Sequence, residues 1–316
     1  MTDRSIDPNR VEALLVGAID PHVHSGPSIA ERGVDHLELA REASAAGFAA
    51  IVTKDHDYSG VMTAWMINKH HPELRTKVFS SIALNNVIGG FNPYAVEHTA
   101  AMGGKTVYMP TLAAENHLQW EKTSGRVHPA STTKIRATTG VPVLNGDRTL
   151  RDEVKEVLDV IAKADMVLAT GHLHVDEIWI LVKEARQRGV GRIMITHPED
   201  FIQASMDDVR GFAEMGCFVE HSLCMFIDGS KFQHFSGEKL GEYIEAAGVD
   251  LTVMASDLGQ KGEMSPVDGF RRGIELCMRL GYGDEDIRKM VSLNAARVLG
   301  LESLVAAQAV ATPAAA

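Results

Sequence analysis

Eight short apolar runs, separated by longer amphipathic or alanine-rich segments, place the strongest constraint on the fold of this chain. Such an alternation is expected of βα units arranged around a parallel sheet. In chain order the runs are LLVGAID ending at Asp20, FAAIVTK at Lys54, VFSSIAL at Leu84, KTVYMPT at Thr111, MVLATG at Gly171, RIMITH at His197, CFVE at Glu220 and LTVMASD at Asp257. Eight such units predict an α/β fold, specifically a closed (β/α)8 TIM barrel.

Helix signals fall between the runs, where a barrel needs them. The segment VDHLELAREASAAG ends in Gly47, and VDEIWILVKEARQRG ends in Gly189, a residue type typical just past a helix. The segment TLRDEVKEVLDVIAKA starts from a threonine and has acidic residues in its first turn. We therefore expect one barrel domain over residues 1–302, a length that a single domain of this class commonly has.

Two segments depart from this rhythm. Residues 113–147 are too long and too polar for an ordinary βα loop, and we interpret them as an insertion after strand 4 that forms a substrate lid or hairpin. A solvated insertion or a subunit contact is the equally weighted alternative. The last residues, 303–316, carry almost no charge and no periodicity, so we expect a disordered tail outside the fold.

Composition narrows the classes of partner. The formal net charge of −11 argues against a nucleic-acid partner, which a basic face would favour. The polar first ten residues and the short apolar runs indicate neither a signal peptide nor a membrane span, so we expect a cytoplasmic protein. The three cysteines form no disulfide or zinc-binding spacing and are expected to be reduced. The Met and Trp residues of 59–71 could pack against a neighbouring copy in a homo-oligomer, or they could be buried within the same subunit.

Titratable residues gather at the ends of the predicted strands. In a barrel of parallel strands these ends meet at one rim, where catalytic groups lie. A single histidine at a strand end is more often structural than a ligand, but four strands delivering imidazole and a fifth delivering carboxylate favour a metal site. The residues at these ends are His22 and His24, Lys54 and His56, His172 and His174, His197, and Asp257.

The His-Val-His spacing has a mechanical reason. Alternate residues of an extended chain point the same way, so His22 and His24 can bind one ion together while Val23 faces the wall. Imidazole and carboxylate without thiolate suit one or two divalent transition-metal ions such as Zn²⁺, Mn²⁺ or Fe²⁺.

At this point the chain resembles the amidohydrolase superfamily of metal-dependent (β/α)8-barrel hydrolases, in a less characterised bacterial branch. The resemblance rests on the His-x-His after strand one, a Gly-His after strand five, a Thr-His-Pro after strand six, an Asp after strand eight and the closing NAARVLGL. It implies that His22, His24 and Asp257 bind one metal and that His172 and His197 bind a second. It also implies that Asp257 handles the proton of the attacking water.

One feature departs from the superfamily pattern. Many two-metal members carry a carboxylated lysine at the end of strand four, and KTVYMPT has none there, since Lys105 lies at the opposite end of the run. Strand two ends in Lys54, so we predict that Lys54, carboxylated by CO2, bridges a binuclear metal centre. The alternative is an unmodified Lys54 paired with Asp55 or Glu220 beside a single ion.

The remaining polar residues near strand ends match no superfamily ligand, and we assign them to substrate contact or to orientation of the ligands. They are His56, Asn85, Asn86, His174, Glu220 and His221 at the strand ends, and Arg126 in the insertion. Glu220 in particular is suited to accept a hydrogen bond from a ligand histidine. The basic residues of the insertion, among them Lys122, Arg126 and Arg136, favour an acidic substrate.

The predicted function is hydrolysis of an amide, cyclic amide, lactone or thioester bond in a small metabolite by metal-activated water. Asp257 would accept the proton and pass it to the leaving group. Two other classes stay open. A metal-dependent decarboxylase or hydratase would use the same barrel with one metal, and a non-catalytic metal-binding protein would keep the barrel without needing a proton-handling aspartate.

Overall fold

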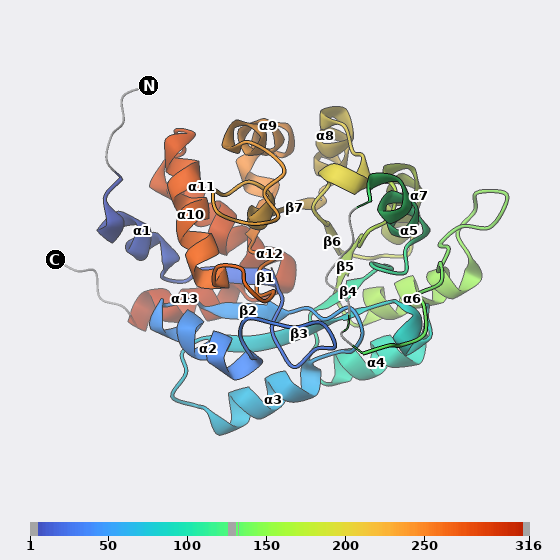
Figure 1. The fold of residues 1–316 in the computed structure, drawn as a ribbon, viewed down its shortest axis with the longest axis horizontal. Helices are drawn as coiled ribbons and strands as arrows, with labels where there is room; N and C mark the ends of the chain where they lie inside the picture. Colours follow the sequence, from blue (N-terminus) through green and yellow to red (C-terminus); the bar gives the residue numbers. More distant parts are fainter. Residues whose placement is uncertain (1–5, 126–130, 132, 312–316) are drawn as a thin grey trace.

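The computed structural model describes residues 6–125, 131 and 133–311 of the chain. Eight parallel strands follow one another around a barrel in sequence order, and helices surround them (Figure 1). The strands are β1 (Ile19–Val23), β2 (Ala50–Thr53), β3 (Lys77–Ala83), β4 (Thr106–Tyr108), β5 (Val167–Ala169), β6 (Arg192–Ile195), β7 (Phe218–Ser222) and β8 (Thr252–Ala255). The predicted (β/α)8 class is therefore confirmed.

Backbone hydrogen bonds bring the last strand back to the first. The amide of Asp257 donates to the carbonyl of His22 at 3.0 Å, and the amide of His24 donates to the carbonyl of Leu258 at 2.8 Å. These bonds lie just beyond β8 and at the end of β1, on the rim where the strands end. The seam of the barrel therefore runs directly through the predicted metal ligands.

The helices pack amphipathic faces on the outside of the strands. In α6, for example, the buried residues Val154, Val157, Leu158 and Ile161 have the spacing of a single helix face. The helices are α1 (Pro8–Leu15), α2 (His36–Ala45), α3 (Val61–His70), α4 (Pro93–Ala101), α5 (Glu115–Ser124), α6 (Asp152–Lys163), α7 (Val175–Gln187), α8 (Met206–Glu214), α9 (Gly237–Ala247), α10 (Pro266–Arg279), α11 (Asp284–Arg288), α12 (Asn294–Leu299) and α13 (Glu302–Ala311). Short turns of helix precede or follow several of them: η1 (Asn86–Ile88), η2 (Asp200–Ile202), η3 (Leu223–Met225), η4 (Val249–Leu251) and η5 (Lys289–Leu293).

The NAARVLGL segment closes the end of the barrel opposite the rim. The Asn294 side chain donates to the carbonyls of Val249 and Thr252, both at 2.7 Å, and so fixes α12 to the start of β8. Ala295 and Val298 pack in the same buried cluster as strand residues such as Ile19. This motif therefore serves stability, in keeping with its place away from the strand ends where barrel chemistry occurs.

The first predicted strand was placed too early. The run LLVGAID does not form a strand throughout, because Leu14 and Leu15 are the last residues of α1 and β1 begins at Ile19. Asp7 caps this helix by accepting from the amide of Asn9 at 3.0 Å. As a result His22 lies inside the strand and His24 follows it directly.

The expected disordered tail is wrong for its first part. Residues 302–311 form α13, whose Leu304 and Val305 pack on the buried cluster at the closed end of the barrel. Residues 312–316 lie outside the described part of the chain. A long segment does follow β4: it contains α5, an isolated bridge between Leu144 and Leu150, and no strand among its described residues. Its role as a lid stays a prediction.

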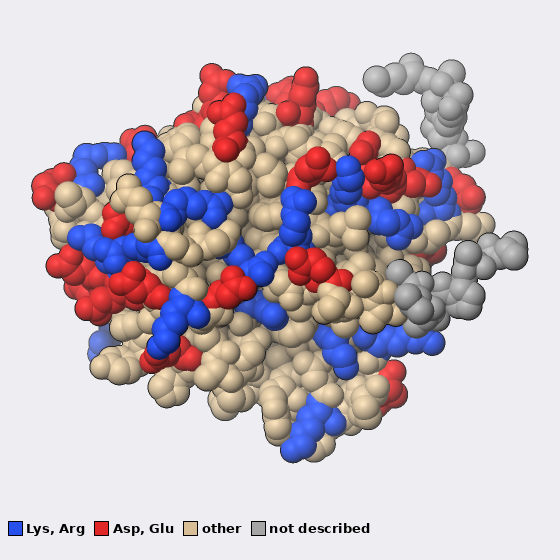
Figure 2. Space-filling view, turned by 180° about the vertical axis from the view of Figure 1, so that it is seen from behind, with Lys and Arg blue, Asp and Glu red and all other residues tan. Residues whose placement is uncertain are grey.

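Four further observations bear on possible partners and on the location of the protein. On α3, Met62 is 69% exposed and Trp65 46% exposed, so these side chains are not buried within the subunit. Basic and acidic side chains are interspersed over the face shown in Figure 2.

Within the described residues no helix is both long and apolar enough to cross a bilayer. Cys217, Cys224 and Cys277 are buried and free.

Candidate metal centre

A pocket of about 360 Å³ lies at the rim formed by the strand ends. Its polar lining comes largely from the strand ends, and its apolar lining comes from α5 and from other segments that follow the strands. The polar lining includes His24, Lys54, His56, His172, His197 and Asp257, and the apolar lining includes Leu112, Trp120, Phe201, Met225 and Phe232. This volume is suited to a small molecule rather than to a polymer.

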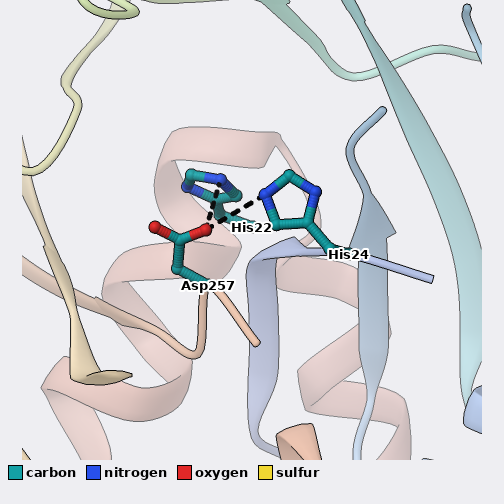
Figure 3. A group of neighbouring side chains, drawn as sticks. All are labelled: His22, His24 and Asp257. Carbon is teal, nitrogen blue, oxygen red and sulfur yellow. Dashed lines mark ion pairs between the residues drawn. The ribbon is translucent and has the colours of Figure 1, made fainter. Parts of the chain in front are cut away.

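His22, His24 and Asp257 converge at the seam between β1 and β8 (Figure 3). The Oδ1 atom of Asp257 lies 3.2 Å from Nε2 of His22 and 3.1 Å from Nε2 of His24. One ligand atom from each of the three residues falls within 4.8 Å of the others. His22 lies in β1, His24 directly follows that strand, and Asp257 comes from the first residues after β8.

Buried acceptors and donors orient this group. The Nδ1 atom of His22 lies 2.7 Å from Oε1 of Glu220 on β7, and both side chains are fully buried. A proton on Nδ1 then donates to Glu220 and leaves Nε2 free to bind a metal, the arrangement typical of histidine ligands. The Ser222 hydroxyl donates to Oδ2 of Asp257 at 3.0 Å, so Oδ1 is the oxygen that faces the histidines.

His172 and His197 form the second half of the site. Their ring centroids are 5.2 Å apart, and the ring of His197 lies 6.1 Å from that of His22. His172 follows β5 and His197 follows β6, so neighbouring strands deliver them to the same wall of the pocket. Among the described residues, however, the three-ligand cluster includes neither of them.

Lys54 lies between the two halves. Its side chain is buried, and its Nζ atom is 2.9 Å from Nε2 of His22 and 4.7 Å from the ring centroid of Tyr108. Tyr108 is the last residue of β4, and its ring also lies 5.4 Å from that of His22. We did not anticipate Tyr108 from the sequence, because it reads as one more apolar residue of a buried strand.

His117 is a second residue that sequence reasoning missed. It lies on α5, is fully buried, and its Nδ1 atom is 3.0 Å from Nδ1 of His172. Its Nε2 atom lies 3.5 Å from Oε1 of Glu121, one helical turn further along. If His172 binds through Nε2, the proton on its Nδ1 donates to His117, whose own proton then faces Glu121. The segment after β4 therefore orients a predicted ligand.

The pKa shifts favour the metal-binding protonation states. Burial lowers the pKa of His24 to about 3, and burial also lowers the pKa values of His172 and His197. Burial on its own raises the pKa of Asp257, but His22, His24 and Lys54 outweigh that effect and hold it well below its usual range. Burial lowers the pKa of Lys54, which favours the neutral amine that reacts with CO2.

The donor set fits a divalent transition-metal ion. Neutral imidazoles and an ionised carboxylate are grouped in a buried place without thiolate, which is the chemistry of zinc, manganese and iron sites. The Nδ1 atom of His197 is also buried and has no hydrogen-bond partner among the described residues. Burying such groups together without a cation would be costly.

The other predicted site residues divide into two groups. His56 lines the pocket, where its ring stacks 5.1 Å from that of His24 and its Nδ1 lies 2.9 Å from Oγ1 of Thr111. Asn85 donates to the carbonyl of His56 at 2.8 Å and accepts from the amide of Thr111 at 2.9 Å, so it joins two loops of the rim.

Three predicted residues lie away from the pocket. Asn86 is exposed and holds Thr139 of the segment after β4, and His174 caps α7 by accepting from the amide of Asp176 at 3.3 Å. His221 does not line the pocket, and it pairs with Glu199 at 2.5 Å, which ties β7 to the loop that carries His197. Arg126 lies outside the described residues.

Comparison with solved structures identifies the class of fold. An amidohydrolase from Pseudomonas aeruginosa is 12% identical, with a TM-score of 0.62 over 93% of this chain and 98% of that chain. The probable dipeptidase PvdM from the same species is 10% identical, with a TM-score of 0.59 over 94% and 98% of the two chains. A putative 2-pyrone-4,6-dicarboxylic acid hydrolase from Pseudomonas putida is 17% identical, with a TM-score of 0.54 over 91% and 98%. The chain therefore has the same fold as these solved structures.

A family model matches residues 17–220, from the start of the barrel to β7. The chain therefore belongs to DUF6282, a family of unknown function. No curated protein matches the sequence.

The first prediction concerns the three-residue cluster. Replacing His22 and His24 together by Ala should remove the metal ion held with Asp257, while the barrel stays folded because its apolar core lies below the rim. Elemental analysis of the purified variant, together with its far-UV spectrum, measures both outcomes. The double variant H70A/H71A, at the exposed end of α3, is the control and should keep its metal. Full metal retention in H22A/H24A would exclude the ligand assignment.

The second prediction concerns His117. The variant His117→Leu removes the partner of His172 Nδ1 and should weaken binding of an ion at His172 and His197 by roughly 10- to 100-fold, the usual effect of losing such a partner. The ion held by His22, His24 and Asp257 should stay bound. Competition with a chromophoric chelator resolves the two affinities, and His98→Leu on the exposed face of α4 is the matched control. Equal affinities in wild type and H117L would contradict this role.

Proposed function

We propose that this chain is a metal-dependent hydrolase that cleaves an amide, cyclic amide, lactone or thioester bond of a small metabolite. The observation that carries the proposal is the convergence of His22, His24 and Asp257 beside His172 and His197 in one pocket of about 360 Å³. The superfamily fold adds support, since its solved members include proteins described as an amidohydrolase and a probable dipeptidase.

His22, His24 and Asp257 would hold one ion, and His172 and His197 a second. When bound, a divalent ion such as zinc, manganese or iron lowers the pKa of water and polarises the oxygen of the bond to be cleaved. Asp257 is suited to accept the proton of the attacking water, because it is ionised and lies at the pocket surface with 14% of its side chain exposed. It then returns the proton to the leaving group.

Lys54 would serve the centre as a carboxylated bridge. Its neutral amine attacks the carbon of CO2 and loses a proton, which gives a carbamate with two oxygens. The position of Nζ, 2.9 Å from His22 and close enough to influence the pKa of both His172 and His197, supports this role. An unmodified Lys54 beside one ion would instead favour the decarboxylase or hydratase reaction.

We also propose that residues 113–147 form one wall of the substrate pocket and act as its lid. Trp120 of α5 lines the pocket and His117 contacts His172, which supports the first part of this proposal. The exposed Met62, Trp65 and Met66 of α3 support association of two copies. The three free cysteines are consistent with the reducing conditions of the cytoplasm, where we place the protein.

The third prediction tests the proposed reaction. The metal-loaded protein should hydrolyse at least one compound in a panel of N-acyl amino acids, dipeptides, lactones and thioesters. On that compound Asp257→Asn should lower kcat by about a hundredfold or more, because a positioned acid–base group is lost. Release of product is followed by chromatography at full metal occupancy of each variant.

The control for this variant is Asp207→Asn, which changes an exposed carboxylate in the first turn of α8. It should turn over at the wild-type rate. Wild-type kcat in fully metallated D257N would exclude the proton-handling role, and no hydrolysis of any panel compound by the metal-loaded wild type would count against the hydrolase itself.

The fourth prediction concerns Lys54. The variant Lys54→Ala should lose the second ion and most of its activity together, and acetate should partly restore both by filling the space of the carbamate. Mass spectrometry under native conditions and elemental analysis measure these outcomes, with the exposed Lys163→Ala as control. A plain amine with a single bound ion in the wild type would refute the bridge and favour the decarboxylase or hydratase alternative.

A further inference from the structure

A buried arginine lies beside the candidate metal centre. The side chain of Arg32, in the loop after β1, is only 6% exposed and lines the same pocket as His24 and Asp257. Of the basic residues on which we first based an acidic substrate, Lys122 and Arg136 are exposed in the segment after β4 and do not line this pocket, and Arg126 lies outside the described residues. Among the described residues that line the pocket, Arg32 is the one arginine available to bind an anion near the metal ligands.

The backbone around Arg32 is fixed to the loop that carries Asp257. Arg32 and Gln260 form an antiparallel bridge across the rim. On one side of it the amide of Gly33 donates to the carbonyl of Gly259 at 2.8 Å, and on the other the amide of Lys261 donates to the carbonyl of Glu31 at 3.3 Å. The position of Arg32 is thus set by the same loop that positions Asp257, as substrate recognition close to the reacting bond requires.

Within the protein the guanidinium is poorly satisfied. Its Nε atom is buried and has no hydrogen-bond partner in the described part of the chain. Its Nη2 atom donates to Ser28 Oγ at 3.3 Å and lies 3.8 Å from Asp55 Oδ2, beyond hydrogen-bond distance. The other oxygen of Asp55 instead accepts from the amides of Asp57 and Tyr58. A buried guanidinium with such weak partners is costly unless a ligand completes its hydrogen bonds.

We propose that Arg32 binds a carboxylate of the substrate, and that the substrate is a small carboxylic acid whose apolar part packs against Trp120, Phe201 and Phe232. The proposal rests on the proposed function and names its substrate class. A planar carboxylate matches the planar donor fork of arginine. A doubly charged phosphate fits less well, because the pocket offers one guanidinium and also contains Asp200.

The test uses two probes of nearly the same size and shape, one of which is an anion and the other neutral. These are 3-phenylpropanoate and its neutral primary amide, titrated calorimetrically into the metal-loaded full-length protein. The wild type should bind the acid at least about tenfold more tightly than the amide, the scale of one charge-assisted pair. In Arg32→Met this preference should disappear, while affinity for the amide and the metal content stay unchanged.

Two further variants make the test decisive. Arg210→Met removes an exposed arginine of α8 that pairs with Asp207, and it should keep the full preference for the acid. Arg32→Lys keeps the positive charge but not the fork, and should lose at least about threefold in acid affinity. Because Arg32→Lys keeps a cation opposite Asp55, this variant should fold and can test the proposal even if R32M does not fold.

Three results would overturn the proposal. The first is that the wild type binds acid and amide equally, or binds neither. The second is that R32M still prefers the acid, which would mean that the metal ions bind it. The third is that R32K binds the acid as tightly as the wild type does. The acid contains no bond that the proposed reaction cleaves. The primary amide does, so its turnover is monitored as ammonia release. If the protein binds the acid through Arg32 but hydrolyses nothing, the carboxylate subsite is supported and the hydrolase is refuted. If it hydrolyses a compound at the same rate without Arg32, the hydrolase is supported and the subsite is refuted.

Discussion

The candidate site depends on how the barrel closes between its first and last strands. The bonds from Asp257 to His22 and from His24 to Leu258 join the two chain segments that carry the three clustered ligands. Closure needs a glycine just after them, because Gly259 has a φ of +117° and a Cβ there would lie 1.4 Å from the carbonyl oxygen of His24. The contact that completes the sheet is thus the contact that assembles the site.

Electrostatics then determines what the assembled residues do. The fold gathers His24, Lys54, His172, His197 and Asp257 around one pocket. All of them except the partly exposed Asp257 are buried, and burial drives the imidazoles and the amine towards their neutral forms. Asp257 stays ionised because its neighbours favour the carboxylate. A group of neutral donors around an anion has an evident use in binding a cation, and it has little use in stabilising the barrel, whose apolar clusters lie elsewhere.

The sequence predicted the barrel and the strand-end residues because both are local patterns. Parallel strands buried on both faces appear as apolar runs, and a polar residue at the end of such a run needs no knowledge of its spatial neighbours. The same reasoning misplaced the first strand, since a short apolar run does not distinguish a buried helix from a strand. The Asp7-Pro8 start and the spacing of Val11, Leu14 and Leu15 are helix signals that could have corrected it.

Residues whose role depends on tertiary contact left no such signal. His117 and Arg32 lie in segments between strands, and only the folded chain brings them to His172 and to the pocket. His174 is the opposite case: it sits at a strand end, but Glu177 three residues later makes it a helix cap, a pattern that is readable in the sequence. In α13, Leu304 and Val305 find an apolar partner that composition alone does not reveal.

Backbone conformation gives independent support for a functional rim. His197 has a φ of +22° and Asp257 a φ of +51°, values that side-chain-bearing residues seldom adopt. Just before His172, Gly171 has a φ of +61° and approaches Met109 so closely that a Cβ would lie 2.3 Å from its carbonyl oxygen. Three of the six predicted ligands, His172, His197 and Asp257, therefore sit at or beside strained or sterically restricted positions. Such positions cost conformational energy and are often found at functional sites, so their occurrence at these ligands is consistent with the proposed metal site.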